Sequence, residues 1–135
     1  MTKKSVLALL VLLSFCSLLS AREPGDKVKR TTIQLDSTVA NIGTFPKSAS
    51  SKTVVYTFKN AGKEKLVFYD AAPDCGCLTV QFPEKPVKPG KKGKIIVHYD
   101  GHRKTPARYN HRINIAYNGA PEIFQLRLRF VMTEK

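Results

Sequence analysis

Apolar and polar residues alternate along much of this chain, with the period of two that is typical of half-buried β-strands. Near the C-terminus, Leu128 and Phe130 share one phase, whereas Arg127 and Arg129 hold the other. The same alternation, together with the turn residues between such segments, predicts about seven strands. They cover 31–36, 53–60, 65–72, 78–82, 93–100, 109–118 and 122–131.

Turn and loop residues separate the predicted strands. The Asn-Ile-Gly at 41–43 is turn-like, and 46–51 combines Pro, Lys, Ser and Ala, so we expect no strand there. The Asn-Ala-Gly at 60–62 closes a strand with residues that tolerate the left-handed conformation, and Asn-Gly at 118–119 predicts a hairpin. Because no segment has a sustained helical period, we predict one all-β domain over 31–135, an immunoglobulin-like antiparallel β-sandwich.

The first 21 residues have the features of a secretory signal peptide. Lys3 and Lys4 precede an apolar run, and small or apolar residues follow up to Ala21. The apolar stretch is shorter than the roughly 20 residues that a spanning helix needs. We therefore expect 1–21 to be cleaved after Ala21 and 22–30 to be a flexible lead-in. The mature chain would have no transmembrane anchor and would reach the periplasm or cell envelope.

The chain is strongly basic. It has 23 Lys and Arg against 10 Asp and Glu, a formal charge of +13, and removal of the leader would lower this charge by two. The basic residues are spread along the chain rather than interleaved with aromatic residues in a stripe, so no nucleic-acid partner is expected. A solvated surface explains such charge, and so does binding to an anionic envelope polymer. The basic loops 83–92 and 101–107 are the candidate contact regions for that polymer or for an unknown envelope protein.

Cys75 and Cys77 are the residues through which chemistry is most plausible. They would be the two cysteines of the mature chain, because Cys16 lies in the leader. In an oxidising compartment such a pair favours a disulfide, and Gly76 between them offers unusual backbone freedom. So short a loop gains little stability from closure, which makes stabilisation of the fold a poor explanation for the pair.

Three other interpretations of Cys75 and Cys77 stay open. They could be a redox-active dithiol, although the charge of Asp74 beside them opposes the thiolate form. Two thiolates would also suit copper(I), or the pair could be an inert, compact turn. The histidines available as further ligands are His98, His102 and His111. Their spacing matches no metal motif, and histidines on polar strand faces are usually solvated, so no metal or cofactor is predicted.

Several motifs occur together in a pattern known from one bacterial family. They are Phe-Lys-Asn-Ala-Gly at 58–62, Leu66, Cys-Gly-Cys at 75–77, the Pro-Gly turn within 86–90, and the strands 93–100 and 112–118. Over 53–131 the chain resembles the bacterial domain of unknown function 1573 family. The resemblance implies an exported immunoglobulin-like sandwich, similar to domains of cilium- and centrosome-associated proteins, without an assigned activity. The family motif usually is Ser-Cys-Gly-Cys-Thr, whereas Asp74 and Leu78 flank the cysteines here, and Phe130 stands near an expected glycine.

The sequence contains no Gly-x-Ser-x-Gly, His-Glu-x-x-His or Walker motif, so no catalytic residue is predicted. The predicted function is a non-enzymatic binding module that takes a partner strand at a sheet edge or a partner at its end loops. The alternative is a periplasmic thiol-redox or copper-handling protein that works through Cys75 and Cys77.

Overall fold

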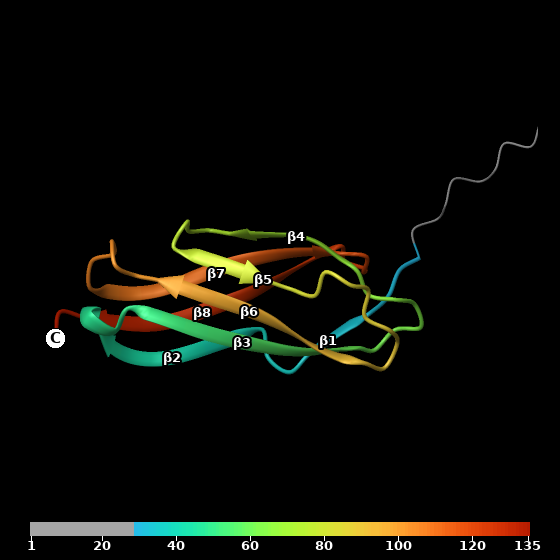
Figure 1. The fold of residues 1–135 in the computed structure, drawn as a ribbon, viewed down its shortest axis with the longest axis horizontal. Helices are drawn as coiled ribbons and strands as arrows, with labels where there is room; N and C mark the ends of the chain where they lie inside the picture. Colours follow the sequence, from blue (N-terminus) through green and yellow to red (C-terminus); the bar gives the residue numbers. More distant parts are fainter. Residues whose placement is uncertain (1–28) are drawn as a thin grey trace, which may run out of the picture.

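The computed structural model describes residues 29–135, which form two packed β-sheets (Figure 1). The predicted signal peptide 1–21, its cleavage after Ala21 and the lead-in up to residue 28 lie outside the described residues. The strands are β1 (Ile33–Leu35), β2 (Val39–Pro46), β3 (Ser51–Asn60), β4 (Phe68–Pro73), β5 (Leu78–Gln81), β6 (Lys92–Asp100), β7 (Ala107–Tyr117) and β8 (Ile123–Thr133). A short 3-10 helix, η2 (Lys47–Ala49), precedes β3. Within residues 29–135 no helix is both long and apolar enough to cross a membrane.

The two sheets each contain four strands. One has the order β1-β3-β6-β5 and the other β2-β8-β7-β4, so the chain changes sheet several times. The immunoglobulin-like sandwich predicted from the sequence is confirmed, with eight strands in place of about seven. One pairing departs from the antiparallel rule, because β2 runs parallel to β8.

Strand β2 runs through the turn-like residues 41–43, so the prediction of no strand there is wrong, whereas the predicted loop 46–51 contains only η2 between the end of β2 and the start of β3. The Asn41 side chain accepts a hydrogen bond from the Gly43 N–H (3.0 Å), and Gly43 has a φ of +74°. The register with β8 shifts between Asn41 and Thr44. The turn-like residues therefore form a β-bulge inside a strand, because β8 offers a free edge that holds the strand on both sides of the bulge.

The core lies between the two sheets and is filled from alternate strand positions, as the apolar phase predicted. The apolar residues with the largest fully buried side chains are Tyr99, Phe58, Leu66, Ile95, Ile113, Ile115, Leu126, Leu128, Met132 and Val97. Each contributes about 1.5–3 kcal/mol when it leaves water. Burial of these side chains is a large favourable contribution to the stability of the sandwich.

Asn60 is a buried hydrogen-bonding centre rather than a left-handed turn residue. Its side-chain amide donates to the carbonyls of Glu64 (2.8 Å) and Val87 (2.9 Å). Its carbonyl oxygen accepts from the Thr31 hydroxyl (2.8 Å) and the Gly62 N–H (3.1 Å). Within residues 29–135 no residue other than glycine has a positive φ, so the conformational role predicted for the asparagine is wrong. The side chain satisfies polar groups where the β-ladder ends.

Asn118 has the same role and ties down the start of the described chain. Its amide donates to the carbonyls of Lys29 (3.0 Å) and Lys65 (2.8 Å), and its carbonyl oxygen accepts from the Val67 N–H (2.8 Å). Next to Lys29, the Arg30 guanidinium contacts the Glu122 carboxylate at 2.8 Å. The last two residues of the predicted flexible lead-in are thus held against the sandwich.

Two isoleucines on adjacent strands test whether this core holds the fold. Ile113 is fully buried, whereas Ile123 is 57% exposed. We expect Ile113→Ala to lower the free energy of unfolding by about 2–5 kcal/mol, because it leaves a cavity. The matched Ile123→Ala control should change it by about 0.5 kcal/mol or less. Urea unfolding measures both, and equal losses would contradict the placement of Ile113 in the core.

Candidate functional site

The cysteine turn crosses from one sheet to the other at one end of the sandwich (Figure 1). It joins β4, in one sheet, to β5, in the other. The Asp74 N–H donates to the Arg112 carbonyl on β7 (2.9 Å), and the Asp100 N–H at the end of β6 donates to the Cys77 carbonyl (2.8 Å). The turn is therefore attached to both layers, which fixes its position relative to the core.

Cys75 and Cys77 are joined by a disulfide, with their Cα atoms 5.1 Å apart. The Cys77 N–H donates to the Cys75 sulfur at 3.1 Å. Gly76 at the tip is exposed, has no positive φ, and has no atom within 4 Å of the place that a Cβ would take. The expectation that Gly76 supplies a backbone conformation forbidden to other residues is thus wrong. The tip of the turn lies in open space.

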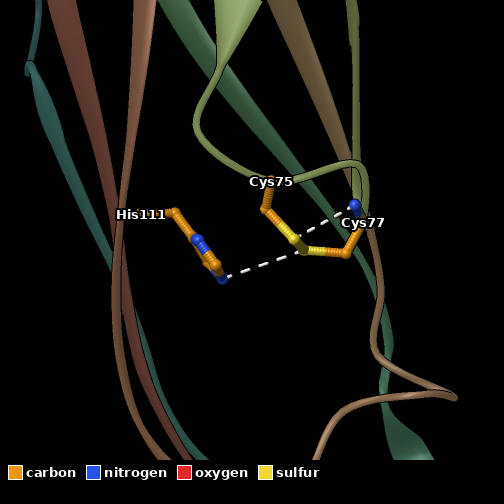
Figure 2. A group of neighbouring side chains, drawn as sticks. All are labelled: Cys75, Cys77 and His111. Carbon is orange, nitrogen blue, oxygen red and sulfur yellow. Dashed lines mark hydrogen bonds between the residues drawn. A yellow bond between two sulfur atoms is a disulfide. The ribbon is translucent and has the colours of Figure 1, made fainter.

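His111 lies beside the disulfide, on β7 (Figure 2). Its Nε2 is 3.9 Å from the Cys77 Sγ, and its Nδ1 is 3.0 Å from the Asp74 Oδ1. A carboxylate only accepts hydrogen bonds, so this contact puts a proton on Nδ1. In the neutral imidazole, Nε2 then carries a lone pair that faces the sulfur atoms. Asp74 is itself oriented, because its Oδ2 accepts from the Arg112 N–H at 2.9 Å.

Aromatic rings surround the His111 imidazole. Tyr109 stacks on it with ring centroids 5.4 Å apart, and Tyr99 and Phe130 each lie 5.9 Å away. Only 10% of the histidine side chain is exposed. A polar ring this deeply buried needs a partner for its N–H, and the Asp74 carboxylate supplies it.

The three histidines have different environments. His98 is on the exposed face of β6, where its Nδ1 lies 3.1 Å from the Thr53 hydroxyl. His102 is exposed and contacts the Asp100 carboxylate at 2.5 Å, and this hydrogen bond lowers the pKa of Asp100. His111 is buried, so the expectation of solvated histidines fails there. A signal was present in the sequence, because His111 has the same phase as Ile113 and Ile115.

Three possible metal ligands meet at this site. One donor atom from each of Cys75, Cys77 and His111 lies within 4.8 Å of the other two. The cysteines and Gly76 also line a hollow of about 460 Å³, which the 101–107 loop borders with Arg103 and Lys104. The other basic loop predicted to bind a partner, 83–92, lies at the opposite end of the sandwich (Figure 1). The two loops therefore form two separate surfaces.

A second candidate site is the outward face of the β2-β8-β7-β4 sheet. Four arginines lie on its two central strands: Arg108, Arg112, Arg127 and Arg129. We call the surface that they form the arginine face. Arg112 and Arg127 stand directly opposite each other in the β7–β8 register. Arg108 and Arg129 also line a hollow of about 550 Å³ at the β2 bulge. Charges that are scattered in the sequence thus gather on one face.

The fold defines this protein as an immunoglobulin-like β-sandwich whose cysteine turn faces a buried histidine. The chain belongs to the family described as "Protein of unknown function (DUF1573)", which it matches over residues 33–131. This match begins about 20 residues before 53–131, the stretch whose motifs resemble the family. No curated protein sequence matches the chain.

Solved structures show the same fold at low sequence identity. A protein of unknown function from Porphyromonas gingivalis W83 matches with a TM-score of 0.68 and 15% identity, over 82% of this chain and 51% of that one. The ASH / PapD-like domain 7 of human CEP192 matches with a TM-score of 0.60 and 8% identity, over 84% of this chain and 93% of that one. The VesB protease of Vibrio cholerae matches with a TM-score of 0.56 and 15% identity, over 74% and 31%.

This chain spans about half of the Porphyromonas protein and about a third of the protease. At such identities the matches show the fold and do not carry an activity to this chain.

Two buried tyrosines, one of them beside His111, differ in one hydrogen bond, and this difference can be tested. The Tyr99 hydroxyl is buried without a partner, whereas the Tyr56 hydroxyl donates to the Arg127 carbonyl at 2.7 Å. We expect Tyr99→Phe to raise the free energy of unfolding by about 1–3 kcal/mol, because an unpaired buried hydroxyl is removed. Tyr56→Phe should lower it by about 0.5–1.5 kcal/mol. Denaturant unfolding compares the two, and a loss of stability in Tyr99→Phe would contradict the unpaired hydroxyl.

The same tyrosine makes a prediction for alkaline pH. Burial raises the pKa of Tyr99 from 10.0 to about 12. Below pH 10 the hydroxyl is neutral in both the folded and the unfolded chain. Its full contribution to the free energy of unfolding is therefore present below pH 10. Between pH 10 and 12 the unfolded chain loses this proton and the folded chain keeps it, so the free energy of unfolding falls. Tyr99→Phe should reduce this fall in denaturant titrations across that range, and an unchanged slope would contradict the prediction.

Proposed function

We propose that this domain is a non-enzymatic interaction module of the bacterial envelope that binds an acidic polymer through its arginine face. The observation that carries the proposal is the direct opposition of Arg112 and Arg127 in the sheet. Like charges opposite each other across two strands destabilise a sheet. Phosphate or carboxylate groups laid across the pair would relieve this repulsion.

The chemistry of the face suits an anionic polymer. A guanidinium group binds phosphate or carboxylate with two parallel hydrogen bonds, which a lysine cannot do. Amide side chains accompany the arginines: Asn110 lies between Arg108 and Arg112 on β7, Asn41 on β2 is opposite Arg129, and the Asn114–Gln125 pair is next to the Arg112–Arg127 pair. Asn110 accepts a hydrogen bond from the Arg129 Nε (3.3 Å), so one arginine is already held in place. Among the described acids, Asp74 forms an ion pair with an arginine of the face, reaching Arg112 Nε at 3.8 Å.

The sheet edges are less favourable for a partner than the arginine face. The edge strands β1 and β5 have three and four residues, and β2 contains a bulge. The remaining edge strand, β4, ends at Pro73, which has no N–H to donate. Short, bulged and proline-terminated edges are devices that discourage strand addition. We therefore favour the open face over the strand addition that the sequence suggested.

Two further observations support an envelope module. The predicted leader 1–21 would deliver the domain to a compartment rich in phosphate- and carboxylate-bearing polymers. The likeness to a PapD-like domain of human CEP192 supports an interaction module at the level of the fold. An envelope protein with an acidic surface would present the same chemical groups and is an alternative outcome of the test.

A charge-matched pair of double variants tests the arginine face. Arg127→Gln with Arg129→Gln removes two charges from this face, and Lys92→Gln with Lys94→Gln removes two from exposed positions on β6, in the other sheet. On immobilised lipopolysaccharide under a salt gradient, we expect the arginine variant to elute at clearly lower salt. The lysine variant should elute close to the unsubstituted protein, because its lost charges lie on the other sheet and salt screens them from the bound polymer.

Equal shifts in the two variants would mean that only net charge matters and would contradict a specific face. If neither the variants nor the unsubstituted protein are retained at low salt, the proposal that the domain binds an acidic polymer is wrong. If an acidic envelope protein binds, and only the arginine variant loses that binding, the partner of the arginine face is a protein and not a polymer.

The alternative function, thiol-redox or copper handling by Cys75 and Cys77, is favoured by the contact of 3.9 Å between His111 Nε2 and Cys77 Sγ. It requires that the disulfide be reduced.

A further inference from the structure

We propose that reduction of the disulfide converts Cys75, Cys77 and His111 into a three-coordinate copper(I) site. The inference goes beyond the interaction module and does not depend on it. The oxidised pair cannot offer two thiolates, since its sulfurs are bonded to each other. Opening that bond would leave two sulfur donors and one imidazole nitrogen facing a common point (Figure 2).

The imidazole nitrogen already lies within reach of a shared ion, whereas the two sulfurs must move apart. Two donors bonded to one ion at about 2.0–2.3 Å lie at most about 4.6 Å apart. The His111 Nε2 lies 3.9 Å from the Cys77 Sγ, inside that limit. The two sulfurs are bonded at 2.02 Å in the disulfide and separate when it is reduced. No atom lies within 4 Å of the place that a Gly76 Cβ would take, so the tip of the turn has room to move.

His111 is oriented as metal-bound histidines are. A ligand histidine usually donates its second ring N–H to a carboxylate, which fixes the ring and selects the nitrogen that binds metal. The Asp74 carboxylate, 3.0 Å from Nδ1, occupies that position. Asp74 is held in turn by the Arg112 N–H, so the imidazole needs no rearrangement to present Nε2. A second observation thus supports the site besides the proximity of the cysteines.

The donor set favours copper(I) over zinc. Thiolates are soft ligands that suit both copper(I) and zinc, but zinc takes a fourth ligand from the protein or from water, whereas copper(I) can be complete with three. The group found within residues 29–135 has three members. Copper(I) with two thiolates and a neutral imidazole carries one negative charge. Arg103 and Lys104 line the hollow in front of the cysteines together with one carboxylate, Asp100, so the two cations stabilise that charge on balance.

The hollow also provides the route for the ion. Cys75 and Cys77 line it directly, whereas His111 approaches from the core side and is almost fully buried. An ion that enters from solvent meets the sulfurs first and then the imidazole. Water is kept from the inner side by the rings of Tyr109, Tyr99 and Phe130.

The redox step is balanced as follows. A dithiol reductant of the thioredoxin class transfers two electrons and two protons, the sulfur–sulfur bond breaks, and two thiols form while the donor becomes a disulfide. Copper(I) then displaces the two thiol protons and forms two copper–sulfur bonds. The Nε2 lone pair forms the third bond, and the metal does not change its oxidation state.

The test uses the exported protein in two forms under anaerobic conditions, as the disulfide and after reduction by a water-soluble phosphine that is then removed. Copper(I) is titrated in competition with a chromogenic chelator. We expect one tightly bound copper(I) per reduced chain and no such binding by the disulfide form. X-ray absorption of the loaded protein should show two sulfur ligands and one nitrogen ligand. Equal binding by the two forms, or an all-sulfur coordination shell, would overturn the proposal.

Three variants separate the roles of the surrounding residues. His111→Gln should weaken copper(I) binding at least tenfold, and Asp74→Asn should weaken it about 10–100-fold while the nitrogen ligand remains in the absorption spectrum. His98→Gln, which alters an exposed histidine on β6, is the matched control and should bind as the unsubstituted protein does. Circular dichroism checks that each variant is folded.

Unchanged affinity in a folded His111→Gln would remove the histidine from the site and overturn the proposal. Displacement of copper(I) from the reduced chain by an equal concentration of zinc(II) would also overturn the proposal. None of these results bears on the arginine face, because its test alters Arg127 and Arg129, with Lys92 and Lys94 as the control, and none of the copper(I) ligands.

Discussion

Two sheets can share one core only if every strand presents alternate side chains to the space between them. This constraint places apolar residues on one phase of β3, β6, β7 and β8 and leaves polar residues on the other. His111 takes an inward position on β7, where apolar residues are otherwise expected. A polar ring at such a position must have its N–H satisfied, and among residues 29–135 the Asp74 carboxylate is the group that does so. The inward placement of one histidine thus determines how the cysteine turn is held.

The ends of the sandwich follow a related rule. Where a β-ladder stops, backbone groups lose their partners and need polar side chains in their place. Asn60 and Asn118 supply these contacts at one end, and Asp74 supplies one near the cysteine turn by accepting from the Arg112 N–H. Asp74 therefore joins two functions, because the same carboxylate orients His111 and fastens the turn to β7. The turn is fixed although its tip lies in open space.

The arginine face is built from side chains on the outward phase of β7 and β8, which point to solvent. Side chains that point to solvent are not selected by packing, so their charge is free to serve binding. Arg112 links the two candidate sites, since its backbone holds Asp74 while its guanidinium lies on the arginine face. A partner bound to that face would therefore lie close to the cysteine turn. The two surfaces are adjacent but chemically separate.

The sequence by itself determined which residues face the core, where most strands lie and that Cys75 and Cys77 are close together. These properties depend on the strand period, on turn residues and on neighbours in the chain, all of which are local. Tertiary structure decided that β2 pairs in parallel with β8 around a bulge, and that His111 meets Cys77 although 34 residues separate them. It also decided that four arginines from two strands form one face. Such facts depend on which strands become neighbours and in what register, and those choices come from contacts between distant segments that no local pattern records.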